Sequence, residues 1–182
     1  MANIDVLSKY ITDEMCRNVR SAEAKQIAVL KKHHSTYGMA LWKWAGLVGY
    51  KEKWDHKRDI RNKFGLWSDD GVTKYEYAFD IWSNIHYGYI GLSIGFSEGI
   101  LKSGAGVAQL KNSGVVETFA SECRASALEL ACFPALDHPK DQAAIQAGFD
   151  LWKTKGLHLT VADVTNMVRS RRTTLNAKRR KS

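Results

Sequence analysis

Cysteine and proline are both scarce in this chain. Among its 182 residues there are three cysteines, Cys16, Cys123 and Cys132, and two prolines. An odd number of cysteines without a Cys-x-x-Cys pair argues against a disulfide framework and against a structural zinc site, so buried, reduced thiols are expected. Without a stretch rich in proline, serine or glycine to serve as a linker, the length predicts one domain.

The sequence also lacks a secretory signal and a membrane span. Its first residues, Met-Ala-Asn-Ile-Asp, contain neither a basic n-region nor an apolar h-region. The most apolar stretch, residues 81 to 100, is interrupted by polar residues that include Asn84, His86 and Glu98, whereas a transmembrane helix needs about 20 mostly apolar residues. We therefore expect a protein that is made and folds in a cytoplasm, and that needs another device if it acts elsewhere.

No familiar catalytic signature is present. The chain contains no His-Glu-x-x-His, no Gly-x-Ser-x-Gly and no paired Cys/His site. Gly104-Ala105-Gly106 lacks the lysine and the strand–loop–helix context of a phosphate-binding loop. No metal ion or cofactor is predicted, and any catalytic site must be assembled from polar residues that are scattered along the chain.

The stretch from Ile81 to Ile100 is the densest apolar segment and predicts a buried central helix. Its glycines, at positions 88, 91, 95 and 99, fall on one side of a helical wheel, and such a face lets another backbone approach closely. Asn84, His86 and Tyr87 lie near the start of this helix, where buried polar groups must find partners.

Other segments also have helical patterns. Residues 3 to 33 predict one long helix or two, and residues 39 to 48 predict a helix closed by Gly49. Residues 113 to 133 and 139 to 155 predict two more, the second closed by Gly156, and Thr160 with Asp163 resembles the capping box of a last helix. The fold class is therefore mainly α, a single globular domain of about six to eight helices around the glycine-faced central helix.

Basic residues are concentrated at the C-terminus. Seven of the 27 lysines and arginines lie within residues 169 to 182, which contain no acid, and without them the bases nearly balance the 19 acids. We divide the chain into a domain of residues 1 to 168 and a basic tail of residues 169 to 182. Such a tail either binds a polyanion or is a solvated, partly frayed end.

The candidate site residues each have a structural alternative. Glu14 could be a surface acid, and Asp55 could pair with Lys57 or cap a turn. His86 could be a core histidine, and Asp137 and Asp141 could serve only the start of a helix. Together they suggest a pocket, because binding sites combine a few convergent polar groups with apolar walls.

Five segments carry a family resemblance. They are Asp13-Glu14-Met15-x-x-Asn18, Trp54-Asp55-His56-Lys57, Asp80-Ile81-Trp82-Ser83-Asn84-Ile85-His86-Tyr87-Gly88-Tyr89-Ile90-Gly91, Gly104-Ala105-Gly106-Val107-Ala108-Gln109 and Asp137-His138-Pro139-Lys140-Asp141-Gln142-x-x-Ile145-x-x-Gly148. In order and spacing they resemble the bacterial polymorphic toxin type 44 domain. The resemblance implies a secreted toxin or effector of bacterial competition or virulence, made in the bacterial cytoplasm and injected into a target cell by a secretion tube or spike protein, such as that of a type VI system. It also implies an immunity protein.

The same family is described as a predicted ribonuclease, and this favours a hydrolase that acts on RNA. In that mechanism Glu14, Asp55 and His86 are catalytic, with His86 as general base or acid and Lys57 stabilising the phosphorane charge. Substrate-binding residues would be Asn18, Lys57, Asn84, Tyr87, Asp137 and Asp141.

Two alternatives stay open. In a peptidoglycan glycosidase acting in the target periplasm, Glu14 would be an acid of raised pKa, Asp55 or Asp80 the second carboxylate, and Trp42, Trp54 and Trp82 would stack on sugars. In a non-enzymatic effector, the chain would act by binding a host protein.

Overall fold

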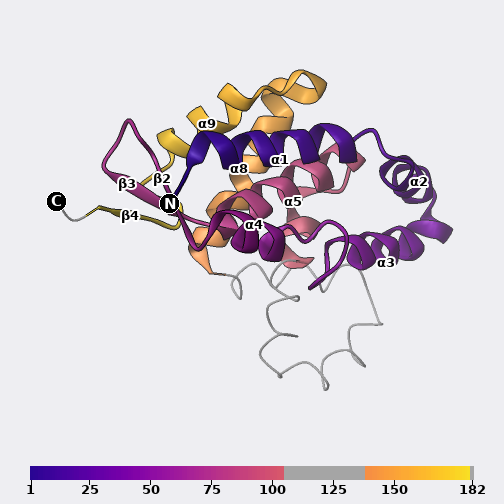
Figure 1. The fold of residues 1–182 in the computed structure, drawn as a ribbon. Coiled ribbons are helices and arrows are strands. Elements are labelled where there is room, and N and C mark those ends of the chain that lie inside the picture. The colour runs from indigo at the N-terminus through magenta and orange to yellow at the C-terminus, as the bar shows by residue number, and fades with distance from the viewer. Residues whose placement is uncertain (105–137, 181–182) are drawn as a thin grey trace.

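A computed structural model describes residues 1–104 and 138–180 of the chain (Figure 1). The described part is mainly helical, as predicted, with one small sheet. Its helices are α1 (Ile4–Asn18), α2 (Ala22–Lys31), α3 (Tyr37–Val48), α4 (Lys57–Phe64), α5 (Asp80–Ile94), α8 (Pro139–Lys155) and α9 (Val161–Ser170). Its strands are β1 (Ala2–Asn3), β2 (Trp67–Asp69), β3 (Tyr75–Ala78) and β4 (Ala177–Arg179). The helix predicted for residues 113 to 133 lies outside the described residues.

Helix α5 is the central element. It contacts α8, α1, α2 and α4, and most of its apolar side chains are buried, with Trp82, Ile85 and Ile90 fully so. This confirms the prediction of a buried central helix. The sheet lies at the end of the molecule opposite α2 and α3 (Figure 1), and none of the helices within the described ranges is both long and apolar enough to cross a bilayer.

The predicted extent of the central helix was wrong at its C-terminal end. Gly95 takes a φ of +96°, in the left-handed region, and ends α5 after Ile94. The four glycines consequently do not share one helix face. A Cβ on Gly99 would meet nothing within 4 Å, whereas a Cβ on Gly88 would lie 2.2 Å from the carbonyl oxygen of Ile145.

Close packing of α5 on α8 depends on a glycine from each helix. Gly148 of α8 faces α5 as Gly88 faces α8, because a Cβ on Gly148 would lie 2.2 Å from the carbonyl oxygen of Ile85. The two backbones approach more closely than any side chain at these positions would allow. This approach brings the first turns of α5 and α8, with their acidic residues, next to each other.

Local capping signals place the helix boundaries. The Oγ of Ser21 accepts a hydrogen bond from the backbone N–H of Ala24, so residues 3 to 33 form two helices rather than one. Gly49 closes α3 and Gly156 closes α8, as predicted. The capping box of Thr160 and Asp163 at the start of α9 is also confirmed.

Residues 169–180 pack on the body of the domain at three points. Strand β4 pairs antiparallel with β3, with Ala177 opposite Tyr77, and Leu175 is 1% exposed in the core. Arg169 forms an ion pair with the buried Asp70 at 3.0 Å. A pattern of side-chain charges does not reveal these contacts, since the ladder uses backbone groups and a single leucine supplies the apolar anchor.

Candidate functional site at the first turns of α5 and α8

Helix α5 carries two groups of polar side chains on different sides. Asp80 and Asn84 are one helical turn apart and share a face, whereas His86 follows Asn84 by two residues, about 200° around the axis. The two groups meet different neighbours. We define two pairs from these contacts. The carboxylate pair consists of Asp80 and its neighbour Asp141, and the imidazole pair consists of His86 and its neighbour His56.

The imidazole pair lies inside the protein, between α1, α4 and α5. The ring centroids of His56 and His86 are 4.4 Å apart, and the rings are nearly perpendicular. His86 is 0% exposed and His56 is 4% exposed. The side-chain amide of Asn18 lies 2.9 Å from Nε2 of His86, and the Tyr10 hydroxyl lies 3.1 Å from Nδ1 of His56.

Burial disfavours the charged form of both imidazoles. It lowers the pKa of His86 well below its usual value, and the neighbouring His56 lowers it further. Burial also lowers the pKa of His56, against the opposing influence of Glu14 and other nearby carboxylates. Nε2 of His56 and Nδ1 of His86 have no hydrogen-bond partner among the described residues. Both rings are enclosed in the structure, and the catalytic role expected for His86 stays a prediction.

The two other expected catalytic residues have local partners. The Glu14 carboxylate accepts a hydrogen bond from Arg17 at 2.8 Å on α1. Its side chain is only 15% exposed, and it lies close enough to His56 to influence the pKa of that histidine. Asp55 accepts hydrogen bonds from the backbone N–H groups of Lys51 and Lys57, at 3.0 and 3.2 Å, and so caps the turn that leads into α4. The side chain that lies against the His86 ring is that of His56, whereas the sequence predicted Glu14 or Asp55 as the partner of His86.

The carboxylate pair lies where the first turns of α5 and α8 meet. Asp80 is the first residue of α5, and Asp141 is in the first turn of α8. Nδ2 of Asn84 donates a hydrogen bond of 2.8 Å to Oδ1 of Asp141. Both carboxylates lie at helix N-termini, where the partial positive charge of the helix favours an anion.

The two carboxyl groups influence each other. Burial raises the pKa of Asp80, and the negative charge of Asp141 raises it further, while Lys57 and the side-chain amide of Asn176 act in the opposite direction. Its Oδ1 atom is buried without a hydrogen-bond partner in the described part of the chain. The pair thus combines a carboxyl group that retains its proton more readily with a neighbouring carboxylate held by an amide, the arrangement that acid–base catalysis uses.

The remaining predicted residues are placed as follows. Lys57 is the first residue of α4 and lies close enough to Asp80 to influence its pKa. The Tyr87 hydroxyl donates a hydrogen bond of 2.8 Å to the backbone carbonyl of Leu101. Asp137 lies outside the described residues. Of the predicted set, the structure brings Asn84, Asp141 and Lys57 together in one place. In another place it brings Asn18 to His86, with Glu14 and Asp55 close enough to the neighbouring His56 to influence its pKa.

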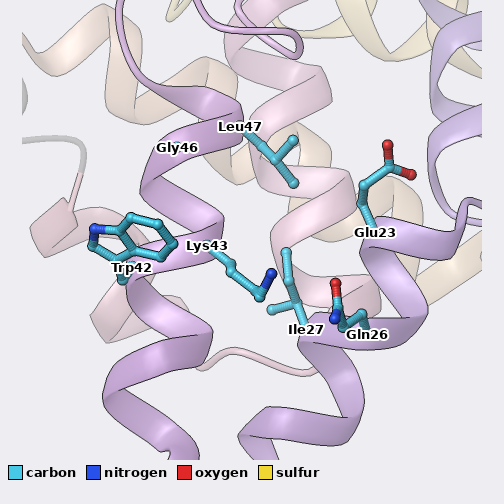
Figure 2. A pocket seen from close by; sticks show the side chains of 7 residues that line it. All are labelled: Glu23, Gln26, Ile27, Trp42, Lys43, Gly46 and Leu47. Carbon is cyan, nitrogen blue, oxygen red and sulfur yellow. The ribbon is translucent and has the colours of Figure 1, made fainter.

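A hollow of about 220 Å³ opens between α2 and α3 (Figure 2). It is lined by Glu23, Gln26, Ile27, Trp42, Lys43, Gly46 and Leu47. None of the predicted site residues except Trp42, an expected sugar-stacking residue, lies in this set. Within residues 1–104 and 138–180, no three histidine, cysteine or acidic side chains lie together as metal ligands would.

A comparison with known protein families matches a part of the chain that includes both pairs. The sequence model of the bacterial toxin 44 family matches residues 43–154. The chain belongs to this family. The matched part of the toxin contains His56, Asp80, His86 and Asp141, but not α1, α9 or β4. No curated protein and no solved structure matches the toxin.

Two residues that shape these pairs were missed at the sequence level. His56 stands within the Trp54–Lys57 motif, and its spacing of four from the buried Ile60 could have indicated an inward face. Asn176 contacts Asp80 from a segment of mostly basic and small residues. No local pattern around Asn176 marks it, because only the pairing of β4 with β3 carries it to α5.

Proposed function

We propose that the toxin is a hydrolase that cleaves RNA by acid–base catalysis at the carboxylate pair. The observation that carries the proposal is the environment of Asp80, whose raised pKa suits a proton donor beside a second carboxylate. Family membership supports a bacterial toxin, and the contacts of Asp80 and Asp141 supply the chemistry.

In the proposed reaction, Asp141 accepts the proton of a ribose 2′-hydroxyl as that oxygen attacks the adjacent phosphorus. Asp80 donates its proton to the departing 5′-oxygen when the P–O5′ bond breaks. The products are a 2′,3′-cyclic phosphate and a free 5′-hydroxyl. Asn84 orients Asp141 through its hydrogen bond, and Lys57 offsets the charge that develops on the phosphorane oxygens.

Basic residues near the pair support a polyanionic substrate. Arg58 and Arg61 are exposed on α4, and Arg61 follows Lys57 by one helical turn. Lys140 lies within 3.4 Å of the Asn176 side chain, which in turn contacts Asp80. Because residues 169–180 pack on the body, their charge is added to that of the domain. RNA binding should then weaken steeply as salt rises.

A glycosidase is the second candidate, since a protonated carboxyl group beside a carboxylate also suits glycoside hydrolysis. The aromatic residues favour RNA over this alternative. Trp54 and Trp82 are buried in the core and cannot stack on a sugar. Trp42 is 75% exposed, but it lies at the hollow between α2 and α3.

Expression in two compartments tests the proposal. Toxicity in the cytoplasm, with RNA fragments ending in 2′,3′-cyclic phosphate, is expected for the parent and is expected to be lost in Asp80→Asn and Asp141→Asn. Asp13→Asn is the matched control, because Asp13 is an exposed acid that pairs with the exposed Lys9. Toxicity confined to the periplasm, with RNA intact, would establish the glycosidase instead. Full toxicity of both variants would remove the carboxylate pair from the reaction.

Delivery and neutralisation are part of the same proposal. As a toxin made by bacteria, the chain would travel with a secretion tube or spike protein and meet an immunity protein in the producing cell. An immunity protein that covers the carboxylate pair would block RNA entry. Co-purification of the parent, but not of charge-reversed α4 variants, with that protein would locate its contact surface.

A further inference from the structure

The hollow between α2 and α3 is small and takes no part in the proposed reaction (Figure 2). Pockets that hold drug-sized ligands enclose about 300–1,000 Å³, so a volume of about 220 Å³ suits a smaller group. Ile27 of α2 and Leu47 of α3 give it apolar walls. At Gly46 the wall is open, because a Cβ there would meet nothing within 4 Å.

Trp42 adds a large exposed ring to this hollow. Its neighbour Trp44 is 5% exposed and packs against Tyr87 and Phe96, whereas Trp42 lines the hollow and is 75% exposed. The two residues lie about 200° apart around α3, so one tryptophan serves the core and the other faces solvent. A flat ligand that stacked on Trp42 would cover apolar surface that is now in water.

Polar side chains complete the lining. Gln26 and Lys43 border the hollow together with Glu23, whose Oε1 accepts a hydrogen bond from Nζ of Lys53 at 2.6 Å. Glutamine and glutamate side chains can bond to the donor and acceptor groups on the edge of a nucleobase, and a lysine ammonium group attracts a phosphate. A lipid tail would offer these polar groups no partner.

The surroundings of the hollow carry an excess of positive charge. Residues 20–53 contain seven lysines and arginines against two acids, so this part of the chain attracts a polyanion. Proteins that bind single-stranded nucleic acid combine a positively charged surface with aromatic rings on which bases stack. The hollow has both features, together with groups that can bond to a base.

We infer that the hollow binds one unpaired base of a single-stranded RNA, stacked on Trp42, with Lys43 facing its phosphate. This assignment rests on the proposed function and adds its substrate class, a single strand. Because α3 packs Trp44 against Tyr87 and Phe96, whereas Asp80 begins α5, the bound base would lie away from the cleaved bond. The family match does not imply this site, since α2 and Trp42 lie outside residues 43–154.

Binding of a fluorescein-labelled RNA of about 12 nucleotides tests the site. Its 2′-hydroxyls are methylated, so that the strand binds without being cleaved. Trp42→Ala should raise Kd about 5- to 100-fold, because it removes the stacking of one base, and Trp42→Phe should restore most of the affinity. Gly46→Leu should also raise Kd, since its side chain would fill the hollow. Met39→Ala is the matched control, because Met39 is an exposed apolar residue of α3 outside the hollow.

An equal Kd for the parent, Trp42→Ala and Gly46→Leu would overturn the inference. Weaker binding of phosphatidylglycerol vesicles by both Trp42→Ala and Met39→Ala, with the Kd for RNA unchanged, would also overturn it in favour of a membrane surface. Cleavage of a dinucleotide, which is too short to reach the hollow, should have the same kcat/KM in the parent and Trp42→Ala. A parent that binds RNA through Trp42 but never cleaves it would retain the base site and refute only the proposed reaction.

Discussion

The imidazole pair and the carboxylate pair share α5 but meet opposite surroundings. His56 and His86 are enclosed by α1, α4 and α5, and their pKa values are lowered by burial. Asp80 and Asp141 lie at the ends of two helices and are both partly exposed. The comparison teaches that one helix can shift titratable groups in opposite directions: burial lowers the pKa of the enclosed imidazoles, whereas burial and a neighbouring negative charge raise the pKa of the partly exposed Asp80.

The largest expected effect comes from a change that breaks both pairs. Gly88→Val would place side-chain atoms against the backbone of α8 at Ile145. We expect a loss of more than about 4 kcal/mol in the free energy of unfolding, because backbone atoms cannot move aside as a flexible side chain can. Urea denaturation measures this loss. Gly46→Ala is the control, since a Cβ there meets nothing within 4 Å, and it should stabilise α3 by up to about 1 kcal/mol.

The next effect should separate function from stability. Asp80→Asn removes the proposed proton donor, so RNA cleavage should fall about 10²- to 10⁴-fold. The melting temperature should stay the same or rise, because a buried carboxyl group is replaced by a neutral amide of the same shape. A melting temperature that falls together with activity would indicate that Asp80 serves the fold and not the reaction.

The corresponding change in the imidazole pair should have the reverse pattern. His86→Ala should cost about 3 kcal/mol of unfolding free energy, since it leaves a cavity and removes the partner of the Asn18 amide. The cleavage rate of the folded fraction should be unchanged. A specific loss of cleavage in fully folded His86→Ala would return His86 to the catalytic machinery and reverse the comparison.

The smallest expected effect is a change in how the stability of the fold depends on pH. The folded pKa of His86 lies below its ordinary value of 6.5, so the unfolded chain binds a proton that the folded chain does not. The contribution of His86 to the free energy of unfolding is therefore fully present above about pH 6.5. It is lost as pH falls toward the folded pKa, by at most about 1.4 kcal/mol per pH unit for one group. Thermal melts of the parent between pH 7 and 5 should show this decline, and His86→Phe should reduce it.

Asp80 should contribute to the pH dependence of stability with a sign opposite to that of His86. Its folded pKa is raised above the ordinary value of 3.8, so its contribution is fully present below that value and is lost as pH rises through the folded pKa. Asp80→Asn should accordingly make the melting temperature less dependent on pH in the acid range. If the melting temperature depends on pH in the same way in the parent, His86→Phe and Asp80→Asn, then neither pair determines the acid sensitivity of the fold.

Much of the helical framework could be predicted from the sequence, whereas the grouping of its polar residues could not. Gly49, Gly156 and the capping box of Thr160 and Asp163 act within a few residues, so short windows of sequence reveal them. The hydrogen bond from Asn84 to Asp141 joins residues 57 positions apart, and that between Asn18 and His86 joins residues 68 apart. Periodicity predicted that these side chains were on helices, but it could not predict which of them would meet.

The sequence by itself determined the mainly helical class, the buried character of α5 and the family segments, because these follow from local propensity and apolar periodicity. Only the tertiary structure decided that the ring of His56 lies against His86, where Glu14 or Asp55 was predicted, and that Asn176 lies close enough to Asp80 to influence its pKa. The physical reason is that both outcomes depend on how whole elements pack. The close approach of α5 and α8 at Gly88 and Gly148 sets the first turns side by side, and the β3–β4 ladder brings a distant asparagine to the same place.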